Sequence, residues 1–163
     1  MPTRRRFLAF LGSGAALAVA AATGVAVFKD EEEESDGFPV IRYGAESCAR
    51  CGMIIDEVRF AAARSGPGKA SKHFDDIGCC ALDAADDIAG EEVRFFVHDY
   101  TDESWLDALG ASYVIAESIR SPMAYGLAAV RDEQAAQRMA GETGGRVYSW
   151  AELPEHLPKR HSS

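Results

Sequence analysis

The feature that most constrains this chain is an uncharged segment close to its start, from Phe7 to Phe28. Its 22 residues are Gly, Ala, Leu, Val, Phe, Ser and Thr alone. Three arginines, Arg4 to Arg6, precede it, and paired arginines before an apolar run are typical of a twin-arginine export signal. About 20 apolar residues can also cross a bilayer, so an uncleaved signal would act as an anchor. We therefore assign residues 1–28 to a signal or membrane anchor and expect the mature chain outside the cytoplasm.

The chain is acidic, and its negative charge lies after this segment. It has 17 basic and 26 acidic residues and a formal charge of −9. Residues 1–28 hold three arginines and no acidic residue, so the remainder carries −12. Residues 29–37 contain a run of acidic side chains that repel one another, which predicts an extended linker. Because an acidic surface repels phosphates, we expect no nucleic-acid partner. The charge also suits solubility in high salt and favours a halophilic source.

The rest of the chain is long enough for one compact domain. Residues 38–157 can bury a single core, and we divide them into halves at 38–110 and 111–157. Residues 158–163 form a polar end that we expect to be a loose tail.

In the first half, the spacing of apolar residues changes from that of strands to that of a helix and back again. The helix is expected to start at Ile77, where Asp75 and Asp76 can cap it and complement its dipole. Gly90 is a stop signal after its end. Strands are expected at residues 60–64, 72–74 and 93–97.

The second half repeats this order of elements. Asp132 is expected to cap a short helix with alanines and Met139 facing inward, and Gly141 to end it. Strands are expected at residues 112–116, 126–130 and 146–149. The fold class that follows is α+β, with two similar β-β-α-β halves forming one small domain.

Most of the side chains that could bind a metal or react lie in the six residues from Cys48 to Met53, which read Cys-Ala-Arg-Cys-Gly-Met. A Cys-x-x-Cys pair alone would indicate zinc, a disulfide or a redox pair. Met53 favours copper over these three interpretations, because thiolate and thioether together form the soft ligand set that suits Cu(I). Gly52 allows the chain to fold closely around an ion. The motif therefore predicts a Cu(I) site with Cys51 and Met53 as ligands, and with Cys48 as a supporting thiol or a disulfide partner of Cys51.

Two further cysteines, Cys79 and Cys80, leave other functions open. With Cys48 and Cys51 they could form a structural zinc site, although a pair without a spacer is poor zinc geometry. A thiol oxidoreductase that uses Cys48 and Cys51 is another alternative, but such a motif normally opens a helix. Cys79 itself could be a reactive thiol at a helix start or a small buried residue.

A second thioether is predicted from the internal repeat. Cys51-Gly52-Met53 in the first half aligns with Ser121-Pro122-Met123 in the second, and a similar strand follows each. Equivalent loops of a duplicated fold can face each other, so Met123 is a candidate ligand of the same ion.

Several ordered motifs together resemble the NosL family, the copper-binding accessory proteins of nitrous-oxide reductase. The resemblance spans roughly residues 43–139. The motifs are Cys48-x-x-Cys51-Gly52-Met53, Phe74-Asp75-Asp76-Ile77-Gly78-Cys79, His98-Asp99-Tyr100, Trp105-Leu106-Asp107-Ala108, Tyr113-Val114 and Pro122-Met123-x-x-Gly126.

This resemblance implies a fold of paired β-β-α-β halves and a role that is not enzymatic. It implies a protein that holds Cu(I) outside the cytoplasm and passes it to nitrous-oxide reductase, with the membrane maturation complex as partner. Under this hypothesis His98 is a further candidate ligand, because imidazole also binds copper. Many family members are lipoproteins, whereas this chain carries a twin-arginine segment and has Cys80 where an apolar residue is common.

Overall fold

The computed structural model describes residues 37–68, 70–86 and 93–158. Contacts divide the chain into a unit of residues 1–31 and a unit of residues 32–163, and all described residues belong to the second. The predicted signal, nearly all of the acidic linker and most of the tail lie outside these ranges. Within them, no helix combines the length and the apolar character needed to cross a membrane.

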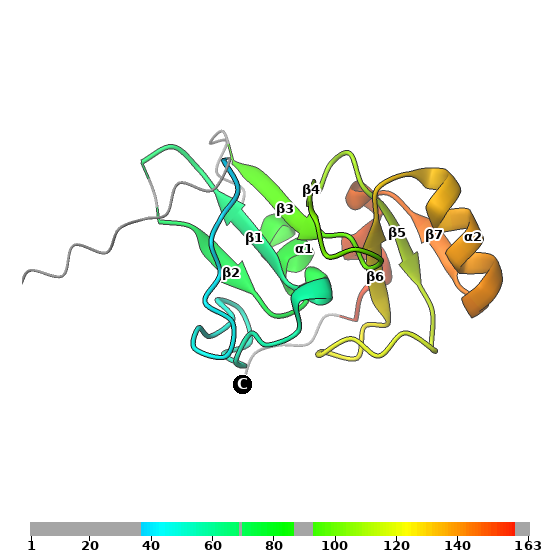
Figure 1. The fold of residues 1–163 in the computed structure, drawn as a ribbon, viewed down its shortest axis with the longest axis horizontal. Coiled ribbons are helices and arrows are strands. Elements are labelled where there is room, and N and C mark those ends of the chain that lie inside the picture. Colours follow the sequence, from blue (N-terminus) through cyan, green and yellow to red (C-terminus); the bar gives the residue numbers. More distant parts are fainter. Residues whose placement is uncertain (1–36, 69, 87–92, 159–163) are drawn as a thin grey trace, which may run out of the picture. The chain divides into compact units, whose positions relative to one another are not determined.

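The first half forms a four-stranded antiparallel sheet with the order β2-β1-β3-β4 (Figure 1). Helix α1, Ile77–Asp86, connects β2 to β3. Ala62 of β1 lies opposite both Phe74 of β2 and Val97 of β3, and all three side chains are buried. The strands of this sheet are β1 (Ala62–Ser65), β2 (Lys72–Phe74), β3 (Arg94–His98) and β4 (Trp105–Asp107).

The second half forms a three-stranded antiparallel sheet with the order β6-β5-β7. Its strands are β5 (Ser112–Ile115), β6 (Leu127–Val130) and β7 (Arg146–Tyr148), and helix α2 (Glu133–Thr143) connects the last two. In each half, the first strand lies between the second and third strands. Both halves therefore have the predicted β-β-α-β order and the same strand arrangement, which confirms the expected fold class.

Some element boundaries differ from the prediction. A short 3-10 turn, Val58–Phe60, replaces the expected start of the first strand, and β4 was not predicted. Helix α2 continues through Gly141 and ends at Gly144, which has a left-handed φ of 70° and donates its N–H to the carbonyl of Ala140. The expected cap at its start is confirmed, since Asp132 accepts a hydrogen bond from the N–H of Ala135.

One buried cluster joins the two sheets through α1. Cys80 and Ala81 of the helix share it with Phe74 of the first sheet and with Tyr113 and Leu127 of the second. Helix α2 covers the other face of the second sheet, where a smaller cluster contains Val114, Ala128, Val130 and Ala136. The 3-10 turn Trp150–Glu152 and helix α3, Leu153–His156, complete the described fold beside α1. The junction of β2 and α1 is buried, since Phe74, Asp75, Asp76 and Ile77 are at most 2% exposed.

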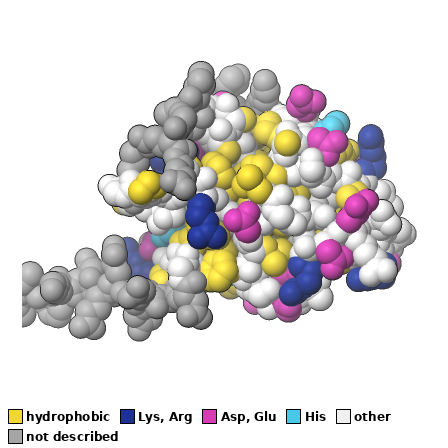
Figure 2. Space-filling model, turned by 90° about the horizontal axis from the view of Figure 1, so that it is seen from above, with side chains coloured by type: hydrophobic (Ala, Val, Ile, Leu, Met, Phe, Trp, Pro, Cys, Tyr) yellow, Lys and Arg dark blue, Asp and Glu magenta, His cyan; other side chains and the backbone are white. Residues whose placement is uncertain are grey.

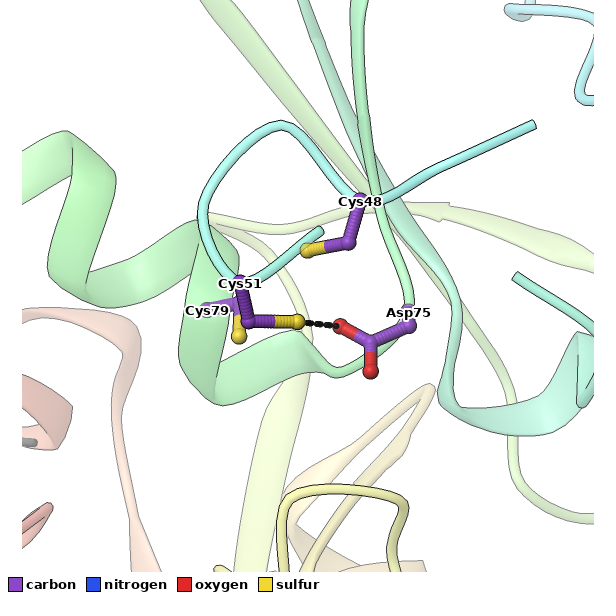
Figure 3. A group of neighbouring side chains, drawn as sticks. All are labelled: Cys48, Cys51, Asp75 and Cys79. Carbon is purple, nitrogen blue, oxygen red and sulfur yellow. Dashed lines mark hydrogen bonds between the residues drawn. The ribbon is translucent and has the colours of Figure 1, made fainter. Parts of the chain in front are cut away.

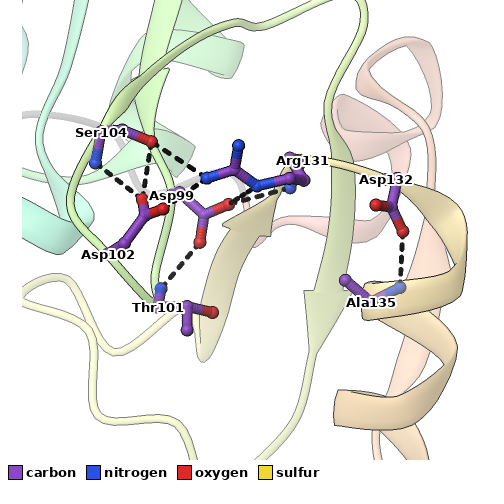
Figure 4. A network of polar contacts seen from close by, with 7 residues as sticks. All are labelled: Asp99, Thr101, Asp102, Ser104, Arg131, Asp132 and Ala135. Atoms are coloured by element: carbon purple, nitrogen blue, oxygen red, sulfur yellow. Dashed lines mark hydrogen bonds and ion pairs between the residues drawn. The ribbon is translucent and has the colours of Figure 1, made fainter.

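A polar network fixes the loop after β3 against the end of β6 (Figure 4). The buried carboxylate of Asp99 accepts the N–H groups of Thr101 and Arg131, at 2.8 and 3.1 Å. The Arg131 guanidinium also pairs with Asp102 and Asp99. The N–H of Tyr100 donates to the carbonyl of Ala129 at 2.8 Å. These contacts bind the first half to the second.

Candidate metal centre

The Cys-x-x-Cys motif lies on a closed turn. The N–H of Cys48 donates to the carbonyl of Met53 at 2.7 Å, and the N–H of Gly52 donates to the carbonyl of Cys48 at 3.0 Å. Gly52 has a φ of +77°, a left-handed conformation that glycine adopts without strain. This geometry explains the glycine of the motif and brings both thiols to one side of the turn (Figure 3).

Contacts with β2 and α1 hold this turn in place. The N–H of Ala49 donates to the carbonyl of His73 at 2.8 Å. Arg50 forms an ion pair with Asp86 at the end of α1, at 2.8 Å. The turn therefore faces the junction where β2 ends and α1 begins.

Two adjacent aspartates occupy this junction and have different roles. Asp76 acts as the predicted cap, because one carboxylate oxygen accepts the N–H of Gly78 at 2.8 Å. Its other oxygen accepts the N–H of Met123 at 3.0 Å. Asp75, also predicted as a cap, instead accepts a hydrogen bond from the thiol of Cys51 at 3.2 Å.

Three thiols and one carboxylate form the candidate metal centre (Figure 3). One potential ligand atom from each of these residues lies within 4.8 Å of all the others: Cys48, Cys51, Asp75 and Cys79. Cys51 is partly exposed, and the other three are buried. The second carboxylate oxygen of Asp75 is buried without a hydrogen-bond partner. A buried carboxylate oxygen is unfavourable unless something binds it, so this oxygen supports the assignment of a metal site.

The thiols of the cluster differ in their affinity for protons. A hydrogen bond from Cys79 lowers the pKa of Cys48 to about 4. Burial raises the pKa of Cys51 to about 12 and that of Asp75 to about 6. The hydrogen bond to Cys48, together with burial, also raises the pKa of Cys79. Cys48 thus loses its proton more readily than Cys51 or Cys79, and an incoming metal ion would displace the protons that remain.

The zinc alternative with four cysteine ligands is wrong in one residue, Cys80. Cys80 is fully buried, and its sulfur points to the carbonyl of Ala63 at 3.9 Å. Successive residues of a helix point in directions about 100° apart, so Cys79 and Cys80 cannot both face the same ion. Asp75 completes the group of four in place of Cys80. No cysteine is in a disulfide among the described residues.

The Cys-x-x-Cys motif predicts Cys48 and Cys51 correctly as members of the cluster, whereas the sequence favours capping for Asp75 and leaves Cys79 as either a reactive thiol or a small buried residue. A possible signal was their i, i+4 spacing, which brings a residue at a helix start close to one in its first turn. The contact with Cys51, 24 residues earlier, depends on the tertiary fold.

The loops around residues 48–54 and 117–125 lie on the lower side of the domain in Figure 1, the first in cyan and the second in yellow. Met53 directly follows the thiol turn and is 46% exposed. Met123 is partly buried against the main core, and its N–H binds Asp76, next to Asp75 of the cluster. The structure therefore brings the Met123 loop to the start of α1, while the role of both sulfurs as ligands stays a prediction.

His98 is not a member of the thiol cluster, and both of its ring nitrogens have a partner in the protein. Its Nδ1 atom is 2.7 Å from the carbonyl of Glu103, and its Nε2 atom is 2.8 Å from the hydroxyl of Tyr43. Only an N–H can donate to a carbonyl, so Nδ1 carries the proton and Nε2 accepts from Tyr43. Burial lowers the pKa of His98, which keeps the ring neutral. Its predicted role as a ligand would require the Tyr43 hydrogen bond to break.

The fold and the cluster together define a small duplicated β-β-α-β domain with a thiol-rich group that could hold a metal ion. The NosL family profile matches residues 40–158, and the chain therefore belongs to the NosL family. It is similar to the copper-binding lipoprotein NosL of Stutzerimonas stutzeri, with 27% identity over 171 residues that cover 94% of this chain and 86% of that protein. The crystal structure of the copper chaperone NosL from Shewanella denitrificans has a similar fold. The TM-score is 0.58 at 19% identity, covering 71% of this chain and 94% of that one.

Proposed function

We propose that this chain is an extracytoplasmic carrier of Cu(I) that delivers copper for the assembly of nitrous-oxide reductase. The observation that carries the proposal is the convergence of Cys48, Cys51 and Cys79 on one carboxylate, that of Asp75. The names of its relatives, a copper-binding lipoprotein and a copper chaperone, support the same cargo.

The sulfur donors of the site favour Cu(I) over Cu(II). Thiolates and thioethers are soft ligands that select Cu(I). The cluster supplies three sulfurs. Met53 directly follows the thiol turn, and the backbone N–H of Met123 binds Asp76, the residue after Asp75. We propose Cys51 as the principal thiolate, with Cys48 and Cys79 beside it and the two thioethers toward the surface.

Differences in exposure suggest a direction of transfer. Cys48 and Cys79 are 4% and 1% exposed, whereas Met53 is 46% exposed and Cys51 is intermediate. An acceptor can therefore reach the ion from the side of Cys51 and Met53. Soft ligands can exchange one at a time between donor and acceptor, so copper need not pass through water as a free ion.

The proposed location and partners follow from the sequence and the family. The twin-arginine segment would export the domain, and an uncleaved segment would hold it at the membrane. Nitrous-oxide reductase and its membrane maturation complex are the proposed partners. On the face seen in Figure 2, basic side chains are scattered among acidic and apolar ones, which supports the expectation that nucleic acid is not a partner. We propose a carrier role without catalysis.

A transfer assay tests this function. Copper-loaded protein is mixed with metal-free nitrous-oxide reductase and membranes containing its maturation complex, and copper in the reductase is measured after the two are separated. The proposal expects copper to appear faster than from an equal amount of chelated Cu(I). Equal rates from both sources would contradict a delivery role.

Zinc is the second candidate, because Asp75 provides an oxygen ligand that zinc accepts alongside cysteines. Elemental analysis of protein purified under reducing conditions separates the two. Copper in near-equimolar amount supports the carrier, and zinc that cannot be displaced by Cu(I) supports a structural site. A thiol oxidoreductase receives less support, since Cys48 and Cys51 lie on a turn and not at a helix start.

A further inference from the structure

The three clustered thiols differ in their access to solvent, and this difference bears on their reactivity. Cys51 is partly exposed, whereas Cys48, Cys79 and Cys80 are all buried. A dissolved reagent can therefore reach the sulfur of Cys51 before any other. Buried structural cysteines are comparatively inert, because reaction requires access to the thiolate.

The turn that carries Cys51 also supplies a second thiol. Cys48 lies three residues earlier, on the same turn closed by the hydrogen bond from Gly52 to Cys48. The sulfurs of Cys48 and Cys51 lie within 4.8 Å of one another, so a small rotation of the side chains can bring them to the distance of a disulfide bond. Cys79 is also within reach, but it belongs to α1, whose residues are packed in the main core. A bond to Cys79 would join two separate elements, whereas a bond to Cys48 stays within one turn.

We propose that Cys51 is a reversible oxidation site for low-molecular-weight disulfides, and that Cys48 converts the mixed disulfide into a Cys48–Cys51 bond. In the first step, the sulfur of Cys51 gives up its proton to solvent and attacks the disulfide R–S–S–R, a Cys51–S–S–R bond forms, and one thiolate R–S⁻ leaves. In the second, the Cys48 thiolate attacks the Cys51 sulfur and releases the second R–S⁻. The protein loses two hydrogens and the small disulfide becomes two thiols. A dithiol reverses the reaction.

This oxidation would regulate the metal site. A Cys48–Cys51 bond removes two of the three clustered thiolates and leaves only Cys79 and Asp75 unchanged. Bound metal would in turn protect both sulfurs, since a coordinated thiolate is not free to attack. This consequence rests on the proposed copper function, whereas the oxidation itself does not.

The test uses reduced, metal-free protein treated with glutathione disulfide under argon. Trypsin cleaves after Arg50, between the two cysteines, so a Cys48–Cys51 bond is detected as two joined peptides by mass spectrometry. We expect this product, with no glutathione retained. Joined peptides that contain Cys79, a stable glutathione adduct or an unreacted protein would each overturn the proposal.

Variants test the order of events. Cys51→Ser is expected to slow oxidation by about tenfold or more, while Cys80→Ser, whose sulfur points to the carbonyl of Ala63, oxidises at the parent rate. Equal rates for Cys51→Ser and the parent would overturn the assignment of Cys51. Oxidation of the parent protein after Cu(I) loading is a separate measurement. If the expected bond forms without metal and copper does not slow it, the oxidation site stands and the proposed copper ligands are wrong.

Discussion

The thiol of Cys51 donates a hydrogen bond to one carboxylate oxygen of Asp75 at 3.2 Å, across 24 residues of sequence. The other oxygen of Asp75 is buried without a partner. The aspartate thus holds the most accessible thiol of the cluster by one oxygen and keeps the second free. This arrangement suits a carboxylate that binds or orients a metal centre.

Replacing Asp75 by asparagine should weaken Cu(I) binding. The change keeps the size of the side chain but removes the charge that faces the three thiols. Loss of a group that orients metal ligands typically reduces affinity by about 10- to 100-fold, and competition with a colorimetric Cu(I) chelator measures it. Asp99→Asn is the matched control, because Asp99 is also buried but belongs to the network in Figure 4. Equal affinities of Asp75→Asn and the parent would exclude this role.

The two candidate thioethers can be tested without large changes of volume. Exchange of methionine for leucine usually changes stability by less than about 1.5 kcal/mol, so Met53→Leu and Met123→Leu should fold. We expect each to lower the Cu(I) affinity in the same chelator assay. Met139→Leu is the control, since Met139 is on α2 and packs against the separate cluster of the second sheet. If all three variants bind Cu(I) equally, the thioethers are not ligands.

Gly126 positions the end of the Met123 loop and should not tolerate a side chain. It has a φ of +66°, and an added Cβ would lie 2.4 Å from the carbonyl oxygen of Ala116. Gly144 has a similar φ of +70° but open space around it. Left-handed backbone alone costs about 1–2 kcal/mol, and the steric overlap adds a comparable amount. Urea denaturation should therefore show a larger loss for Gly126→Ala than for Gly144→Ala. The reverse order would contradict this packing.

The network between the two halves should depend on Asp99 far more than on Asp102. Asp99→Ala removes the buried carboxylate that accepts the N–H groups of Thr101 and Arg131, and hydrogen bonds to a charged group contribute about 1.5–3 kcal/mol each. Asp102→Ala removes an exposed partner of Arg131 and should change stability little. Thermal unfolding of both variants compares them. A similar loss in the two would show that the buried carboxylate has no special role.

The sequence predicted the fold well where local patterns decide it. The spacing of apolar residues located α1, and Asp132 marked the start of α2. The end of α2 was wrong because Gly141 and Gly144 are both plausible stops, and only the packing of β7 after the helix distinguishes them. Strand β4 is three residues long and has no alternation to detect.

The site was only partly predictable for a related reason. The spacing of Cys48 and Cys51 on one turn is local, so the motif revealed it. The approach of Asp75 and Cys79 to that turn depends on how β2 and α1 pack against it. The orientation of Cys80 away from the cluster follows from helix geometry once α1 is known to begin at Ile77.

The most direct test of the central claim is competition for Cu(I) between a colorimetric chelator and three proteins: the parent, Cys51→Ser and Cys80→Ser. Both cysteines are in the described fold, but only Cys51 belongs to the cluster. The account predicts that the parent and Cys80→Ser withdraw Cu(I) from the chelator with equal affinity and that Cys51→Ser no longer does so. Unchanged affinity of Cys51→Ser would contradict the assignment of this cluster as the copper site.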